Sequence, residues 1–66
     1  MQEGRVKWFD DKKGFGFIES NGHDYFAHYK EIQGNGFKTL REGQTITFSP
    51  AEGLKGKVAR NISYID

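Results

Sequence analysis

Glycine spacing is the feature that most restricts what this chain can fold into. Nine glycines, at positions 4, 14, 16, 22, 34, 36, 43, 53 and 56, divide its 66 residues into short segments. Glycine weakens helix interiors, and the segments between the glycines lack helical periodicity. Several segments alternate apolar and polar residues instead, as around Ile46 and Phe48. This pattern predicts a small all-β domain.

Strand patterns occur in five segments, at 4–10, 15–19, 24–28, 44–49 and 57–65. Asn21-Gly22 is typical of a tight hairpin turn, so the first three segments should form a meander. The connection from 29 to 43 has room for one short helical turn at 30–32. Pro50 should end the fourth strand or lie at a sheet edge, because proline has no backbone N–H to donate.

A meander followed by a long connection and two more strands fits a small barrel, which removes the exposed edges of an open sheet. An OB-type barrel of five antiparallel strands and an SH3-like barrel both satisfy this strand count. We expect residues 1–66 to form a single domain, because the chain is too short for two.

Composition excludes several classes of function. The chain has no cysteine, and its two histidines, His23 and His28, have no further cluster of ligands beside them. We therefore expect no disulfide, no metal and no other cofactor. No apolar run approaches the ~20 residues that span a bilayer, and the N-terminus lacks the apolar stretch of a signal peptide. We expect a cytoplasmic protein that does not bind membranes. A net charge of +1 is too balanced to indicate a partner.

Aromatic residues are unusually frequent, at 15% of a chain that is only 35% hydrophobic. Alternation in segments 15–19 and 24–28 separates two sets of side chains. The set expected in the core is Gly16, Ile18, Tyr25 and Ala27. The set expected side by side on the outer sheet face is Phe15, Phe17, Phe26 and His28. The opposite assignment would bury these rings and expose Ile18, so we favour the first.

Such a face suits single-stranded nucleic acid, whose unpaired bases can stack on the rings while lysines hold the phosphates. Lys13 lies at one end of the aromatic set, and Lys7 and Trp8 come from the neighbouring first segment. Strict alternation would place Trp8 beside Val6 in the core, so an exposed Trp8 requires a bulge or a strong twist.

Two motifs, KGFGFI at 13–18 and YFAHY at 25–29, resemble the paired ribonucleoprotein-type motifs of the bacterial cold-shock domain. The resemblance extends through GRVKWF at 4–9, IQGNGFKTL at 32–40 and EGQ at 42–44, and it fades near the C-terminus. It covers nearly the whole chain, with the motifs in the expected order.

This resemblance implies an OB-type barrel that binds single-stranded RNA and single-stranded DNA with a modest preference for pyrimidines. It also implies an RNA chaperone and a regulator of transcription or translation, often in the response to cold stress. By motif match, the stacking positions are Trp8, Phe15, Phe17, Phe26, His28, Tyr29 and Phe37. The polar or basic positions are Lys7, Lys13, Asp24 and Lys55. Phe9 borders this surface and is expected to be partly in the core.

Several residues depart from the family pattern. Asp10 stands where Asn is common, which places a negative charge near the phosphate path and should weaken binding slightly. Tyr29 replaces a usual Phe and adds a hydroxyl group. Lys55 replaces a common Arg and so loses a planar group that could stack.

Two other classes of function compete with nucleic-acid binding. An SH3-like module gripping proline-rich peptides would share the aromatic groove, but acidic residues would normally line it, in place of Lys7 and Lys13. An RNA-recognition-motif domain is a structural rival and not a third function, and it needs two helices that this chain has no room for. We do not expect an enzyme, because no nucleophile–base pair or metal-binding carboxylate cluster can be assembled around His28. A monomer is the simplest expectation.

Overall fold

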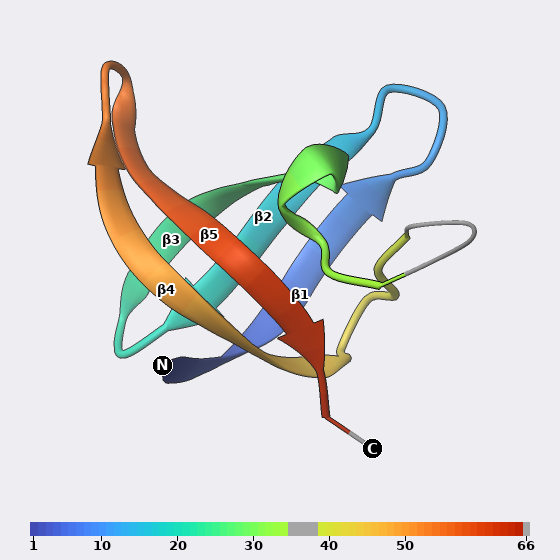
Figure 1. Cartoon of the computed structure of the whole chain (residues 1–66), viewed down its shortest axis with the longest axis horizontal. Coiled ribbons are helices and arrows are strands. Elements are labelled where there is room, and N and C mark those ends of the chain that lie inside the picture. The colour runs from blue at the N-terminus through green and yellow to red at the C-terminus, as the bar shows by residue number, and fades with distance from the viewer. Residues whose placement is uncertain (35–38, 66) are drawn as a thin grey trace.

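Five strands form a closed barrel in the computed structural model, which describes residues 1–34 and 39–65. The elements are β1 (Gln2–Asp10), β2 (Phe15–Ser20), β3 (His23–His28), the short 3-10 helix η1 (Tyr29–Glu31), β4 (Thr45–Gly53) and β5 (Gly56–Tyr64). Around the barrel the strands follow the order β1-β2-β3-β5-β4, with β4 paired back to β1 (Figure 1). The expected all-β barrel of the OB type is confirmed.

Strand direction differs from the expected arrangement at one place. β3 and β5 run parallel and pair only at Phe26 and Val58, whereas each of the other neighbouring pairs is antiparallel. Directions cannot alternate all the way around a closed ring of five strands, so one pair must be parallel. β3 and β5 thus share fewer paired residues than any other two neighbouring strands of the barrel.

The hairpin between β2 and β3 has the geometry predicted from its sequence. Asn21 and Gly22 have φ angles of 53° and 81°, and positive values at both positions are typical of a type I′ turn. The resulting register pairs Phe17 with Phe26 and Ile18 with Tyr25. Phe17 and Phe26 are therefore neighbours on the outer face, and Ile18 and Tyr25 are neighbours on the inner face.

Two element boundaries differ from the expected ones. The helical turn begins at Tyr29, one residue earlier than the 30–32 interval. β4 continues through Pro50 to Gly53. Beyond Phe48, the pairing of β4 with β1 ends and only β5 remains beside it, so Pro50 lies at an edge, where its missing N–H is tolerated.

The core consists of the inner side chains of all five strands together with two residues from the connection before β4. Its buried members are Val6, Ile18, Tyr25, Ala27, Ile32, Leu40, Ile46, Phe48, Ala59 and Ile62. The Tyr25 and Phe48 rings pack with their centroids 4.9 Å apart. The core set predicted by alternation is therefore confirmed, and the aromatic side chains of the opposite set are left outside it.

A β-bulge at Lys7 determines which way the next residues of β1 face. Val6 pairs with Ile18 but Trp8 pairs with Phe17, so Lys7 is an extra residue in β1. Trp8 consequently faces outward, and Phe9 turns inward opposite Gly16. The bulge required for an exposed Trp8 is present.

Gly16 allows β2 to approach β1 closely at this bulge. A Cβ atom on Gly16 would collide with the carbonyl oxygen of Trp8 and lie 2.7 Å from Cα of Phe9. Both are backbone atoms, so no side-chain rotation can relieve the overlap.

Replacing Gly16 with Ala is expected to lower the free energy of unfolding by about 3 kcal/mol, because the two strands must separate to admit the methyl group. Urea or thermal unfolding measures the change. The matched control is Gly22→Ala, whose added Cβ meets nothing within 4 Å and whose cost is conformational only. Equal losses in the two variants would contradict the close approach.

Within residues 1–34 and 39–65, no helix has the length and apolar character to cross a bilayer.

Candidate nucleic-acid interface

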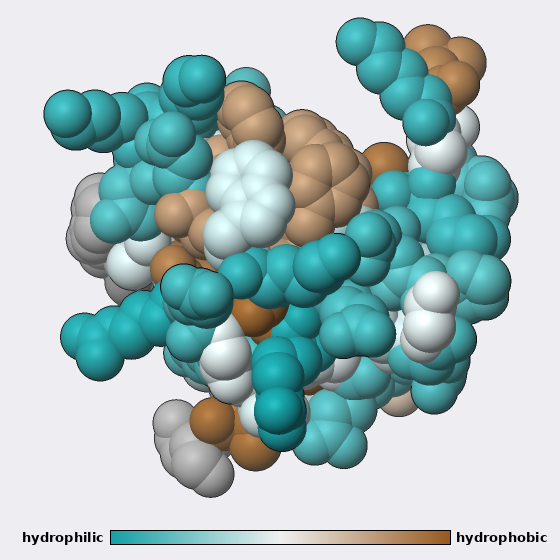
Figure 2. Space-filling view, turned by 180° about the vertical axis from the view of Figure 1, so that it is seen from behind, coloured by the Kyte–Doolittle hydropathy of each residue, from teal (hydrophilic) through white to brown (hydrophobic). Residues whose placement is uncertain are grey.

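Six aromatic rings form a continuous network on the outer surface of β1, β2, β3 and η1, and we call this network the ring platform. Its members are Trp8, Phe15, Phe17, Phe26, His28 and Tyr29. Neighbouring ring centroids lie between 4.7 and 6.4 Å apart. Figure 2 shows this side of the molecule, with brown and pale side chains gathered in its upper half and hydrophilic ones around them.

Each ring of the platform is partly buried against the sheet and partly exposed to solvent. Phe15, Phe17, Phe26 and His28 are half-buried, because their neighbours in the strands face the core. Trp8 and Tyr29 are 43% and 41% exposed. Aromatic faces on a fixed sheet offer flat contact area with little loss of side-chain freedom on binding.

Phe9 and Phe37 stand apart from the other aromatic residues predicted to bind. Phe9 packs against the core, as expected for a residue at the border of the surface. Phe37 lies outside the described residues.

Lys7 and Asp24 come together across the edge of the platform. The Nζ atom of Lys7 lies 3.2 Å from Oδ2 of Asp24, and both side chains are about half exposed. An exposed ion pair adds little to stability. The pair does place a hydrogen-bond donor and an acceptor side by side, with Lys7 directly before Trp8 in β1 and Asp24 two residues before Phe26 in β3.

The turn between β1 and β2 is organised by Asp10. Its Oδ1 atom accepts hydrogen bonds from the backbone N–H groups of Lys12 and Lys13, at 2.9 and 3.0 Å. The carbonyl oxygen of Asp10 accepts another from Gly14 at 2.7 Å. The carboxylate thus positions the backbone of Lys13, a role that the sequence did not indicate.

Gly14 then connects this turn to the platform. Its carbonyl oxygen accepts a hydrogen bond from the backbone N–H of Tyr29 at 2.9 Å, and its φ angle is 80°. A Cβ atom there would lie 2.7 Å from the Tyr29 ring. Close approach of the ring therefore requires glycine at this position.

Two substitutions of Asp10 distinguish the effect of its charge from the effect of its hydrogen bonds. Asp10→Ala is expected to lower stability by about 1 kcal/mol, because two backbone N–H groups lose their acceptor. Asp10→Asn retains a side-chain carbonyl oxygen at the same place and should stay close to the parent in stability. Urea unfolding of the two variants makes the comparison, and equal destabilisation by both would contradict the acceptor role.

A hollow of about 500 Å³ extends the platform toward the β4–β5 hairpin. Phe17 and Phe26 form one wall, Asp24 lies at its rim, and the hairpin contributes Lys55, Gly56, Lys57 and Val58. Lys55 and Asp24 are thereby brought together with two of the platform rings. Lys57 pairs with Glu52 at 3.2 Å, which partly neutralises its charge.

Val58 belongs to this surface although sequence reasoning did not select it. It pairs with Phe26 in the parallel bridge and is half-buried, while the next residue, Ala59, lies in the core. Alternation in segment 57–65 puts Val58 and Ala59 on opposite faces of the strand. It does not show that this strand pairs with β3.

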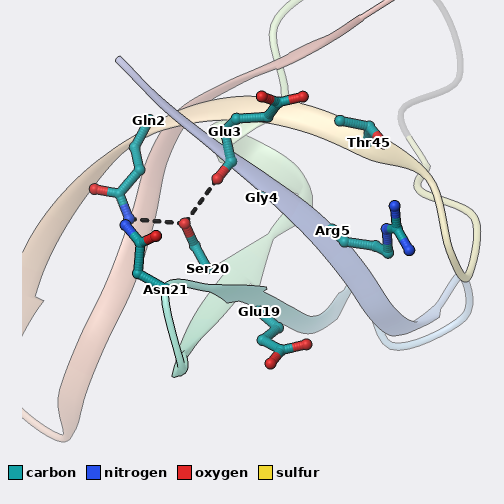
Figure 3. A pocket seen from close by; sticks show the side chains of 8 residues that line it. All are labelled: Gln2, Glu3, Gly4, Arg5, Glu19, Ser20, Asn21 and Thr45. Atoms are coloured by element: carbon teal, nitrogen blue, oxygen red, sulfur yellow. Dashed lines mark hydrogen bonds between the residues drawn. The ribbon is translucent and has the colours of Figure 1, made fainter.

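A different hollow lies between the ends of β1, β2 and β4 (Figure 3). It has a volume of about 510 Å³ and a mainly polar lining with no aromatic ring. Inside it, the buried Ser20 hydroxyl donates to the carbonyl oxygen of Glu3 and accepts from the Gln2 side chain, both at 2.7 Å. These bonds hold the start of β1 against β2, so we assign this hollow a structural role.

In the part of the chain that the structure describes, no three acidic residues or histidines lie close enough together to hold a metal ion.

Comparison with known proteins places the chain in a family. Residues 2–65 match the family described as the 'Cold-shock' DNA-binding domain. The chain is 53% identical over 64 residues to a cold shock-like protein CspD of Bacillus cereus, covering 96% of this chain and 97% of that protein. It is 56% identical over 64 residues to the major cold shock protein of Streptococcus pyogenes serotype M1, covering 96% of each. Cold shock protein CspB of Bacillus caldolyticus is 52% identical over 63 residues, covering 94% of this chain and 96% of that protein.

These matches span almost the whole chain, with the motifs of the ring platform inside them. The chain therefore belongs to the cold-shock domain family, whose members are nucleic-acid-binding domains and not enzymes.

Proposed function

We propose that the ring platform binds single-stranded RNA and single-stranded DNA by stacking unpaired bases on its rings. The observation that carries this proposal is the unbroken contact of six partly exposed rings, from Trp8 at one end to Tyr29 at the other. Stacking a base on such a ring contributes about 1–3 kcal/mol, and it tolerates any base because every base has a π-face. Bases in a duplex are already stacked on each other, so the platform selects single strands.

The charges around the platform support a polyanionic ligand. Lys7, Lys13 and Lys55 are all exposed at its border. A proline-rich peptide carries no regular negative charge that would use them, so the SH3-like interaction module is not favoured. Asp10 lies in the same turn as Lys13, and its charge should lower the affinity for phosphate slightly.

A protein that captures only unpaired strands melts weak RNA hairpins by mass action. Binding the open state withdraws it from the folding equilibrium, with no need for ATP. This is the activity of an RNA chaperone, and it would let the protein modulate transcription or translation. A preference for pyrimidine-rich sequences, a monomeric state, one domain over residues 1–66 and a cytoplasmic location belong to the same proposal.

Removing single rings tests the platform directly. Phe15→Ala, Phe17→Ala and Phe26→Ala are each expected to weaken binding of a labelled oligothymidine by about 1–3 kcal/mol, because each variant loses one stacking surface. Fluorescence anisotropy at constant salt measures the affinity. Circular dichroism should show the barrel retained, because these side chains are outside the core.

Leu54→Ala is the matched control, since Leu54 is fully exposed at the tip of the β4–β5 hairpin and makes no part of the platform. Its affinity should equal that of the parent protein. Ring variants that bind as tightly as the parent would contradict the proposal. Ring variants that unfold would show that the rings are core residues.

A further inference from the structure

A second hollow adjoins the ring platform on the η1 side of the Phe26–Val58 contact. It has a volume of about 250 Å³ and is lined by the rings of Phe26 and His28, by Val58 and Ala59, and by the charged Glu31 and Arg60. Pockets for drug-sized ligands usually measure roughly 300–1,000 Å³, so this hollow suits something smaller, such as one base. Because two platform rings form its wall, a strand stacked on the platform passes beside it.

Glu31 and Arg60 place opposite charges side by side in this hollow. The Oε1 atom of Glu31 accepts a hydrogen bond from the backbone N–H of Asn61 at 3.3 Å and lies 3.8 Å from Nε of Arg60. Asn61 has a φ angle of 52° at a bulge in β5, and this bend turns its N–H toward η1. The carboxylate therefore has a defined place, with the guanidinium group beside it.

His28 lies at the platform side of the hollow. Its Nδ1 atom accepts a hydrogen bond from the backbone N–H of Lys30 at 3.2 Å, at the start of η1. The hollow thus combines a carboxylate acceptor and a guanidinium donor with the side chains of His28, Val58 and Ala59.

We propose that this hollow is a nucleotide subsite that selects guanine within a bound single strand, with Glu31 and Arg60 as the specificity-determining residues. This inference rests on the proposed function of the platform. Guanine carries two adjacent donors, the ring N1–H and the amino group, which match a carboxylate. The neighbouring O6 acceptor matches a guanidinium.

The other bases fit this pair of charges less well. Thymine and uracil offer a carboxylate a single N–H and no amino group. Cytosine and adenine each offer the carboxylate only one donor, an amino group. The ring nitrogen next to that amino group is an acceptor, which a carboxylate repels. A subsite that hydrogen-bonds one base edge disfavours the others because its polar groups are left unpaired.

The test measures binding of an oligothymidine of about seven nucleotides, a length within the usual range for an OB fold. It is compared with a set in which one thymine at a time is replaced by guanine, cytosine or adenine. At one position, guanine should tighten binding about five- to tenfold, the lower part of the discrimination expected for a paired base edge. At the same position, cytosine and adenine should give no such gain.

Glu31→Gln should remove the guanine advantage, measured in the variant itself as the ratio of its affinities for guanine-substituted and plain oligothymidine. Gln keeps a side-chain oxygen for the N–H of Asn61, so the contact between η1 and β5 is retained. Arg60→Ala, at a side chain that is 59% exposed, should also remove the advantage. Glu42→Gln is the matched control, because it removes the same charge from an exposed turn away from the hollow and should keep the advantage.

Guanine giving no advantage at any position would overturn this inference and leave the platform proposal intact. An advantage that survives both Glu31→Gln and Arg60→Ala would overturn it as well. Failure of the parent protein to bind any member of the set would instead contradict the proposed function itself.

Discussion

The close pairing of β1 with β2 is the constraint on which the aromatic surface depends. Lys7 is inserted as a bulge, and Gly16 lets the two backbones meet beside it. Without the bulge, regular alternation would send Trp8 into the core and Phe9 to the surface. Without glycine, a Cβ atom would push the strands apart. The extra residue in β1 and the glycine in β2 together place Trp8, the only tryptophan of the chain, next to Phe15 and Phe17.

A small barrel can expose so many rings because its inner face supplies enough burial by itself. Gly16 pairs with Ala27 and Ile18 pairs with Tyr25 on the inside of the β2–β3 hairpin, while Phe17 and Phe26 pair on the outside. Small inner residues bring the sheet close to the opposite wall, and larger ones such as Tyr25 and Phe48 fill the rest. The outer rings then stay partly exposed and pack against one another.

Local pattern was enough to predict the parts of this protein that depend on alternation and turn chemistry. The Asn21-Gly22 turn, the inner and outer sets of β2 and β3, and the need for a bulge before Trp8 all follow from neighbouring residues. The parallel bridge between Phe26 and Val58 does not, because it joins strands far apart in the chain and is imposed by closing a ring of five.

The same limit applies to the polar groups around the surface. Arg60 and Glu31 are 29 positions apart and meet only because η1 docks on β5, where Ile32 bridges Ile62. Asp10 looked like a charge near the phosphate path, and only the folded turn shows that it also accepts hydrogen bonds from Lys12 and Lys13. Contacts of this kind depend on tertiary structure that a single sequence does not display.

Fluorescence of Trp8 during titration with a short oligothymidine, at low and at moderate salt, tests the central claim most directly. Trp8 is the only tryptophan and lies in the platform, so its signal reports one place on this surface. Stacking predicts quenching that saturates and a salt dependence that is shallow, because few phosphates are neutralised. Unchanged fluorescence, or binding that disappears on adding moderate salt, would contradict the claim that the rings carry the affinity.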